Sequence, residues 1–101
     1  MSLKQVYEPY FKIGTSVSFR NIESEQAAKE LQKHYSSITA ENGMKPMFYL
    51  DKEENQSNPE KYKREPALKF DIPRKFLDFA KENGLALRGH VLVWHGQTPF
   101  W

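Results

Sequence analysis

The chain has 101 residues, which suits one small domain or a part of a larger one. It contains no cysteine, so disulfides, thiolate nucleophiles and cysteine-ligated zinc are excluded. Its net charge is only +2, with acidic and basic residues interleaved, and this pattern does not indicate a nucleic-acid or anionic membrane partner.

The first third of the chain predicts a turn, a strand and a helix. Residues 4–11 predict a short amphipathic turn, and residues 12–19 predict a strand in which Gly14 breaks the regularity. Asn21 is a candidate helix N-cap, and the helix is predicted over about 22–35. Its apolar residues recur at helical spacing: Ala27, Ala28, Leu31 and Tyr35.

The middle of the chain predicts little regular structure. Residues 36–40 predict a short strand, and Pro46 favours a brief helical turn within 44–50 over a strand. Residues 51–65 are rich in Lys, Glu, Asn, Gln, Ser and Pro, which predicts a long solvated loop. This loop contains the glycosylation triplet Asn55-Gln56-Ser57, a pattern that also arises by chance.

The last third predicts a helix followed by a strand. Asp71 is a candidate N-cap with Pro73 just inside the helix, and Asn83-Gly84 is typical of a helix end. Residues 85–94 give a dense strand pattern, and residues 95–99 predict a loop.

The order of these elements predicts an α/β fold with a parallel sheet. Three parallel strands do not close a structure, and a (β/α)₈ barrel needs about 250 residues. Open sheet edges and the aromatic pair Phe100-Trp101 at the end of the chain therefore favour an incomplete fold.

The sequence contains no candidate membrane span, because no apolar run approaches the roughly 18 residues of a membrane-spanning helix. Residues 1–4 lack the apolar stretch of a secretory leader, so we expect no signal peptide in this chain. The compartment of the protein stays open, because a leader replaced by design would leave the same sequence.

Polar and aromatic residues gather after two predicted strands, where sites form in parallel α/β folds. One segment is 39–45, with Glu41, Asn42 and Lys45, and the other is 88–97. If the last strand continues to residue 94, alternation places His90, Leu92 and Trp94 on one face. Carboxylate, carboxamide, ammonium, imidazole and indole groups at one rim suit a polyol ligand.

Simpler interpretations stay open at this stage. Polar residues at strand ends often only tie loops together, a Trp after a strand is often part of the core, and His90 fits a hydrogen-bonded core histidine. A shared metal is disfavoured, because His90 and His95 lie on opposite faces of a continued strand. His34 lies on the predicted helix with no carboxylate expected in register.

Two long motifs resemble glycoside hydrolase family 10. Ser37-Ile38-Thr39-Ala40-Glu41-Asn42-Gly43-Met44-Lys45 resembles that family's S-x-T-A-E-N-x-M-K signature after the second strand. Residues 87–99, LRGHVLVWHGQTP, resemble its L-R-G-H-x-L-V-W-H-x-Q-T-P run after the third strand. Phe11-Lys12-Ile13-Gly14 looks like the family's entry into the first strand. The resemblance covers nearly the whole chain, with residues 51–65 the least familiar.

The resemblance implies the first three βα units of a TIM barrel, with residues 1–101 as the N-terminal portion of one catalytic domain. It implies retaining endo-hydrolysis of β-1,4-xylan with no cofactor and no metal. Matched residue by residue, the implied partners of xylan or xylooligosaccharide are Glu41, Asn42, Lys45, His90, Trp94 and Gln97, with His95 in a supporting role.

No catalytic residue is expected in this chain. The family's carboxylates lie in a W-D-V-V-N-E-like run and a T-E-L-D-like run, and neither is present. Glu41 matches a binding position, and one carboxylate cannot act as both nucleophile and acid/base. We therefore expect these residues to bind sugar poorly alone and to require the remaining barrel segments as partner for cleavage.

Two alternatives from other classes stay open. One is a stand-alone carbohydrate-binding module that uses His90, Trp94 and Trp101 as a platform. The other is a chain that covers its open sheet edges by self-association and has no catalytic function.

Overall fold

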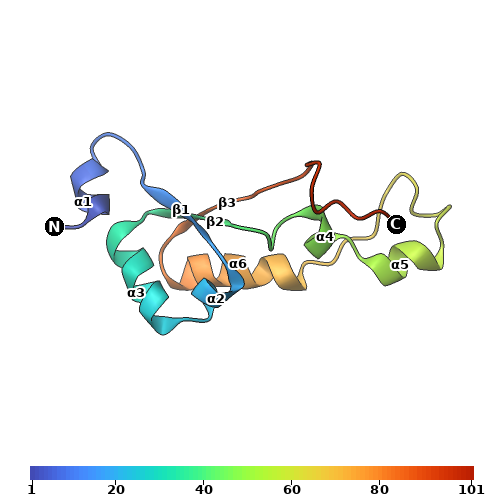
Figure 1. Ribbon diagram of the computed structural model, residues 1–101, viewed down its shortest axis with the longest axis horizontal. Coiled ribbons are helices and arrows are strands. Elements are labelled where there is room, and N and C mark those ends of the chain that lie inside the picture. Colours follow the sequence, from blue (N-terminus) through green and yellow to red (C-terminus); the bar gives the residue numbers. More distant parts are fainter.

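The structure, a computed structural model, describes all 101 residues and has a mixed α/β architecture (Figure 1). Its elements are, in chain order, α1 (Leu3–Tyr7), β1 (Gly14–Val17), α2 (Phe19–Ile22), α3 (Glu25–His34), β2 (Ser37–Ala40), α4 (Pro46–Tyr49), α5 (Lys52–Ser57), α6 (Asp71–Glu82) and β3 (Ala86–Arg88). The molecule measures 56 × 27 × 20 Å, because α1 extends beyond one end of the sheet and α4, α5 and the C-terminal segment extend beyond the other. No helix has the length and apolar character needed to cross a membrane.

The three strands form one parallel sheet in the order β1-β2-β3, as the sequence predicts. The register aligns Thr15 with Ile38 and Ile38 with Leu87 on one face. Helices α2, α3 and α6 cover this face (Figure 1). Val17, Ile38 and the α6 residue Phe76 are at most 1% exposed, so the core lies between the sheet and α6.

The opposite face of the sheet is open and polar. Ser16 is aligned with Thr39, and Thr39 with Arg88, so these side chains share that face. Together with neighbouring residues they line a hollow of about 610 Å³. A parallel sheet normally has both faces covered, so this face is the one that further strands of a barrel would enclose.

The predicted helix over 22–35 is two helices, α2 and α3. Ser18 caps α2 by accepting a hydrogen bond from the Asn21 N–H, and Ser24 caps α3 by accepting one from the Ala27 N–H. Asn21 is therefore a residue inside α2 and not the expected N-cap. The prediction was wrong because Ser18 and Ser24 each begin a separate helix, and a serine side-chain oxygen is a strong cap.

Residues 51–65 are not a loop throughout, because α5 occupies Lys52–Ser57. Asp51 caps this helix through the Glu54 N–H, a signal present in the sequence but masked by the polar composition. Asn55 then closes the following turn: its Nδ2 donates to the Ala67 carbonyl at 2.9 Å and its Oδ1 accepts from the Ala67 N–H at 3.0 Å.

The two predicted helices around residues 44–50 and after Asp71 are confirmed. Residues 46–49 form the expected short helix, α6 begins at Asp71, and Gly84 ends it with a positive φ of 65°. The prediction of Asp71 as the N-cap was wrong: Phe70 is the cap residue and has no side-chain cap hydrogen bond, while Asp71 lies in the first turn, where its negative charge favours the helix dipole. Only glycine fits at position 43, because a Cβ there would lie 2.8 Å from Phe76 Cζ.

The predicted strand 85–94 ends at Arg88. Arg88 pairs with Thr39, and β2 ends one residue later at Ala40, so a strand beyond Gly89 has no neighbouring backbone to bond. The apolar pattern from His90 to Trp94 thus belongs to an irregular segment, in which Leu92 and Val93 are more than 80% exposed.

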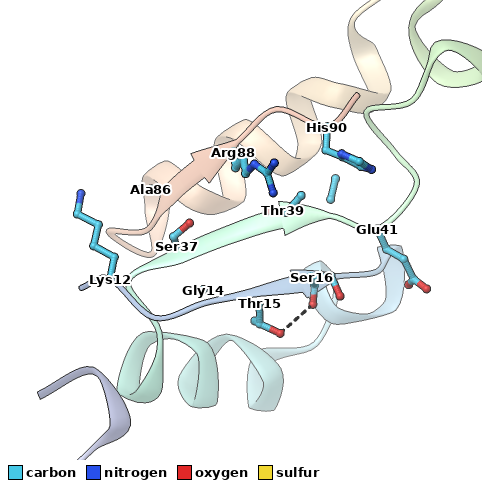
Figure 2. A pocket seen from close by; sticks show the side chains of 11 residues that line it. Lys12, Gly14, Thr15, Ser16, Ser37, Thr39, Glu41, Ala86, Arg88 and His90 are labelled. Atoms are coloured by element: carbon cyan, nitrogen blue, oxygen red, sulfur yellow. Dashed lines mark hydrogen bonds between the residues drawn. The ribbon is translucent and has the colours of Figure 1, made fainter. Parts of the chain in front are cut away.

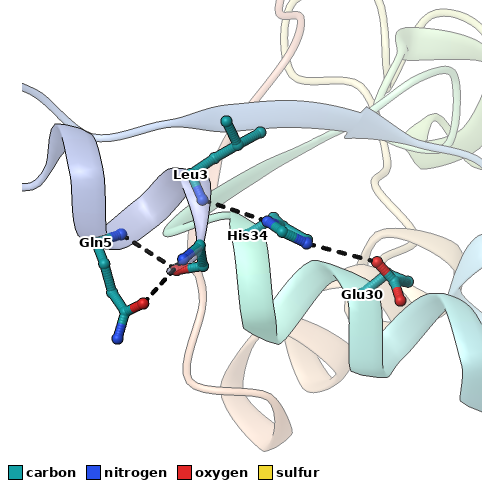
Figure 3. A network of polar contacts seen from close by, with 5 residues as sticks. Leu3, Gln5, Glu30 and His34 are labelled. Atoms are coloured by element: carbon teal, nitrogen blue, oxygen red, sulfur yellow. Dashed lines mark hydrogen bonds and ion pairs between the residues drawn. The ribbon is translucent and has the colours of Figure 1, made fainter.

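Helix α1 packs on α3 through polar contacts (Figure 3). His34 Nδ1 accepts a hydrogen bond from the Leu3 N–H at 3.3 Å, and its Nε2 lies 3.7 Å from a Glu30 carboxylate oxygen. The expectation that no carboxylate is in register with His34 was wrong, since Glu30 lies one helical turn before it. This histidine joins two helices and lies away from the polar face of the sheet.

Candidate functional site

The candidate site lies beyond the carboxyl ends of β2 and β3. Residues 41–45 follow β2 directly, and residues 89–97, named here the His90 loop, follow β3. The short helix α4 starts right after Lys45 and runs beside the His90 loop, because the Met47 N–H donates to the Gln97 carbonyl at 3.0 Å. The two predicted segments are therefore in direct contact.

Lys45 is the centre of this contact. Lys45 is only 7% exposed, and its Nζ donates to Asn42 Oδ1 at 2.8 Å and to Gln97 Oε1 at 2.6 Å. The same ammonium lies 4.4 Å from the ring centroid of Trp94, a cation–π distance. Four of the predicted site residues thus form one group, named here the Lys45 cluster: Asn42, Lys45, Trp94 and Gln97.

The Lys45 cluster contains no carboxylate. The only carboxylate within 4.0 Å of a basic side chain is that of Glu30, which lies beside His34 and far from the cluster. Amide oxygens and an aromatic face therefore stabilise the buried ammonium, and one of its three N–H groups has no protein acceptor. Such a group is a strong donor for a neutral hydroxyl ligand.

Glu41 and His90 lie apart from the Lys45 cluster, on the rim of the polar hollow (Figure 2). Glu41 is exposed and follows Thr39 on the open, polar face of the sheet. His90 continues the same face beyond Arg88 and is half-buried. Glu41 is the only acid that lines this hollow.

His95 packs against Trp94, with ring centroids 4.5 Å apart. The predicted alternation along a strand does not hold here, because β3 ends before the His90 loop. His90 therefore reaches the hollow while Trp94 turns to Lys45, and Leu92 faces solvent. The peptide bond between His90 and Val91 is cis.

Two basic residues that line the hollow, Lys12 and Arg88, were given no role in the sequence analysis, although Arg88 begins the candidate segment 88–97 (Figure 2). The signal was available for Arg88, because it lies two residues before His90 and a strand repeats its faces with that period. No group of three or more His, Asp or Glu side chains is close enough to hold a metal ion.

Comparison with known proteins decides the family. A family model described as "Glycosyl hydrolase family 10" matches residues 2–101. The chain belongs to glycosyl hydrolase family 10. Its sequence is 52% identical to endo-1,4-beta-xylanase B of Butyrivibrio fibrisolvens over 101 residues, which are 100% of this chain and 16% of that protein.

Two further xylanases match the chain over almost its whole length. The chain is 44% identical over 100 residues, 99% of its length, to the bifunctional endo-1,4-beta-xylanase XylA of Ruminococcus flavefaciens and spans 10% of that protein. Among solved structures, the Clostridium thermocellum N-terminal endo-1,4-beta-D-xylanase 10B, complexed with xylohexaose, superposes with a TM-score of 0.82 at 31% identity. That match covers 97% of this chain and 18% of the xylanase chain.

The family assignment confirms the resemblance seen in the two motifs. It also confirms the fold class, since the three parallel strands and their helices are part of a TIM barrel in the family 10 structures they match. The chain spans less than one fifth of the length of each of these three relatives.

Proposed function

We propose that residues 1–101 form the N-terminal part of one endo-1,4-β-xylanase catalytic barrel and supply its glycone-side binding surface. The observation that supports this most directly is the Lys45 cluster. A buried ammonium that contacts only neutral acceptors and an indole face suits an uncharged ligand with many hydroxyl groups and an apolar ring face.

Each residue has a chemical role in the proposal. Lys45 donates its remaining N–H to a sugar hydroxyl, while Asn42 and Gln97 orient the ammonium and offer their own amide N–H groups. Trp94, 40% exposed, presents an indole to the C–H face of a sugar ring. Glu41 and His90, on the rim of the hollow, bind further hydroxyl groups, and His95 supports Trp94.

The cleavage step needs groups from outside these residues. A retaining glycosidase uses two carboxyl groups about 5–5.5 Å apart, one as nucleophile and one as acid/base. The polar hollow has Glu41 as its only acid, and the Lys45 cluster has none. Strands that complete the barrel supply both carboxylates in this proposal, and xylan or a xylooligosaccharide lies across the two parts.

A chimera tests the proposal. Residues 1–101 replace the matched 101 residues of the Butyrivibrio fibrisolvens xylanase, and reducing-sugar release from xylan is measured beside the parent enzyme. We expect a folded chimera to cleave xylan and the isolated chain to cleave none. A chimera that unfolds cooperatively yet releases no sugar contradicts the proposed function, as does cleavage by the isolated chain.

A further inference from the structure

The His90 loop has almost no structure of its own. None of its backbone N–H groups donates to another backbone group. Apart from the bond that Thr98 Oγ1 donates to the Trp94 carbonyl, its hydrogen bonds to the rest of the chain come from three residues in and beside α4. These are Lys45 to the Gln97 side chain, Met47 to the Gln97 carbonyl, and Tyr49 to the middle of the loop.

Tyr49 makes the contact that lies nearest to His90 and Trp94. Its hydroxyl lies 3.2 Å from the Val91 carbonyl and 3.0 Å from the Leu92 carbonyl, so its one hydrogen is shared between them. Val91 directly follows His90, and Leu92 precedes Trp94 by two residues. A single hydroxyl therefore holds the backbone between two of the proposed sugar-binding side chains.

The position of Tyr49 is itself well fixed. Its carbonyl accepts a hydrogen bond from the Lys69 N–H at 2.8 Å, and the next residue, Leu50, forms a β-bridge with Leu68. Its half-buried ring lines an apolar groove with Leu68, Phe70 and Pro73. Helices α4 and α6 are in contact, so Tyr49 is held on a second side as its hydroxyl reaches the loop.

We propose that Tyr49 is a positioning residue that holds the His90 loop in the conformation that presents His90 and Trp94 to substrate, an inference that rests on the proposed function of those two side chains. The Tyr49 hydroxyl is a donor at neutral pH, which lies well below its ordinary pKa of 10.0, and burial raises that pKa further. Loss of a neutral hydrogen bond changes an equilibrium by about two- to tenfold, which sets the expected size of the effect.

The test compares Tyr49→Phe with Tyr62→Phe. Both changes remove one hydroxyl, and the Tyr62 hydroxyl bonds only to Lys61 and Glu54, away from the site. The first measurement is amide hydrogen exchange on the 101-residue chain. The Met47 N–H reports loop docking because it donates to Gln97, whereas the Lys69 N–H reports the Tyr49 backbone.

We expect Tyr49→Phe to speed exchange at Met47 by about two- to tenfold and to leave Lys69 unchanged, with no effect of Tyr62→Phe at either amide. Unchanged exchange at Met47 overturns the inference. Equal acceleration at Met47 and Lys69 also overturns it, because that result means general loosening of α4.

The second measurement separates positioning from stability. In the chimera, Tyr49→Phe should raise KM for xylohexaose about two- to tenfold with a smaller change in kcat, because a loop that is docked only part of the time binds in proportion to the docked fraction. Unchanged KM in an active chimera overturns the role at the sugar site. An inactive chimera contradicts the proposed function instead, and the Met47 exchange alone then decides whether Tyr49 holds the loop.

Discussion

Replacing Lys45 with Met tests the Lys45 cluster most directly, because this change removes the ammonium and keeps an unbranched side chain. The ammonium donates to Asn42 and Gln97 at 2.8 and 2.6 Å and lies 4.4 Å from the Trp94 ring centroid. After the change, the two amide oxygens lose their donor and the indole loses its cation. The sugar loses the third N–H.

The expected size follows from these contacts. A hydrogen bond from a charged donor is worth about 1.5–3 kcal/mol, so loss of the bond to sugar lowers kcat/KM by about one to two decades. The cation–π contact adds about 0.5–2 kcal/mol that fixes Trp94 before the sugar arrives. Because the neighbouring amides are half-buried and can turn to water, we expect a smaller effect on the free energy of unfolding than on kcat/KM.

The assay is the initial rate of reducing-sugar release by the chimera over a range of xylohexaose concentrations. Lys29→Met on α3 is the matched control, since Lys29 is exposed and makes no side-chain hydrogen bond. Urea unfolding of each variant shows whether it is folded. A folded Lys45→Met chimera with kcat/KM within twofold of the unchanged chimera refutes the proposed role of the ammonium.

Three further changes test other parts of the structure. His90→Ala should lower kcat/KM of the chimera by about one to two decades, and His34→Ala, which alters only the α1–α3 contact, should not; equal losses contradict a role for His90 in binding. Asn55→Ala should reduce the free energy of unfolding by about 1–3 kcal/mol by urea titration, because both Ala67 backbone groups lose a partner, and exposed Gln56→Ala should change it little. Burial raises the pKa of Tyr49 in the folded state above its ordinary value of 10.0. The stability that this shift contributes is therefore fully present below pH 10.0 and is lost as the pH rises through the folded-state pKa. Tyr49→Phe should flatten this alkaline loss of stability, and an unchanged alkaline profile contradicts the prediction.

The sheet could be predicted from the sequence because apolar residues recur at every second position on the face that the helices cover. Ile38 and Val17 alternate with polar residues, and the α6 stripe that includes Phe76 has helical spacing. The same residues set the local strand and helix patterns and fill the core, so local pattern and tertiary packing favour the same structure. The family motifs then add the barrel, which three strands alone do not specify.

The His90 loop could not be predicted in the same way. Its residues from Val91 to Trp94 are strand-formers by type, yet strand formation depends on a partner backbone, and β2 has already ended at Ala40. The same limit applies to Tyr49. Its contact with Val91 joins residues 42 positions apart, and no local pattern indicates such a pair. The candidate site residues come from the motifs, and their arrangement comes only from the structure.

The structure separates the residues that stabilise the fold from those that form the candidate site. Val17, Ile38 and Phe76 lie between the sheet and its helices, whereas the Lys45 cluster lies beyond the strand ends and is attached through α4. Substitutions in the cluster should therefore change sugar binding without a matching loss of stability, since they remove no apolar area from the core. A site residue whose replacement unfolds the protein would show that the cluster is part of the core after all. The paired measurement of kcat/KM and unfolding free energy at Lys45 thus tests this separation as well as the role of the ammonium.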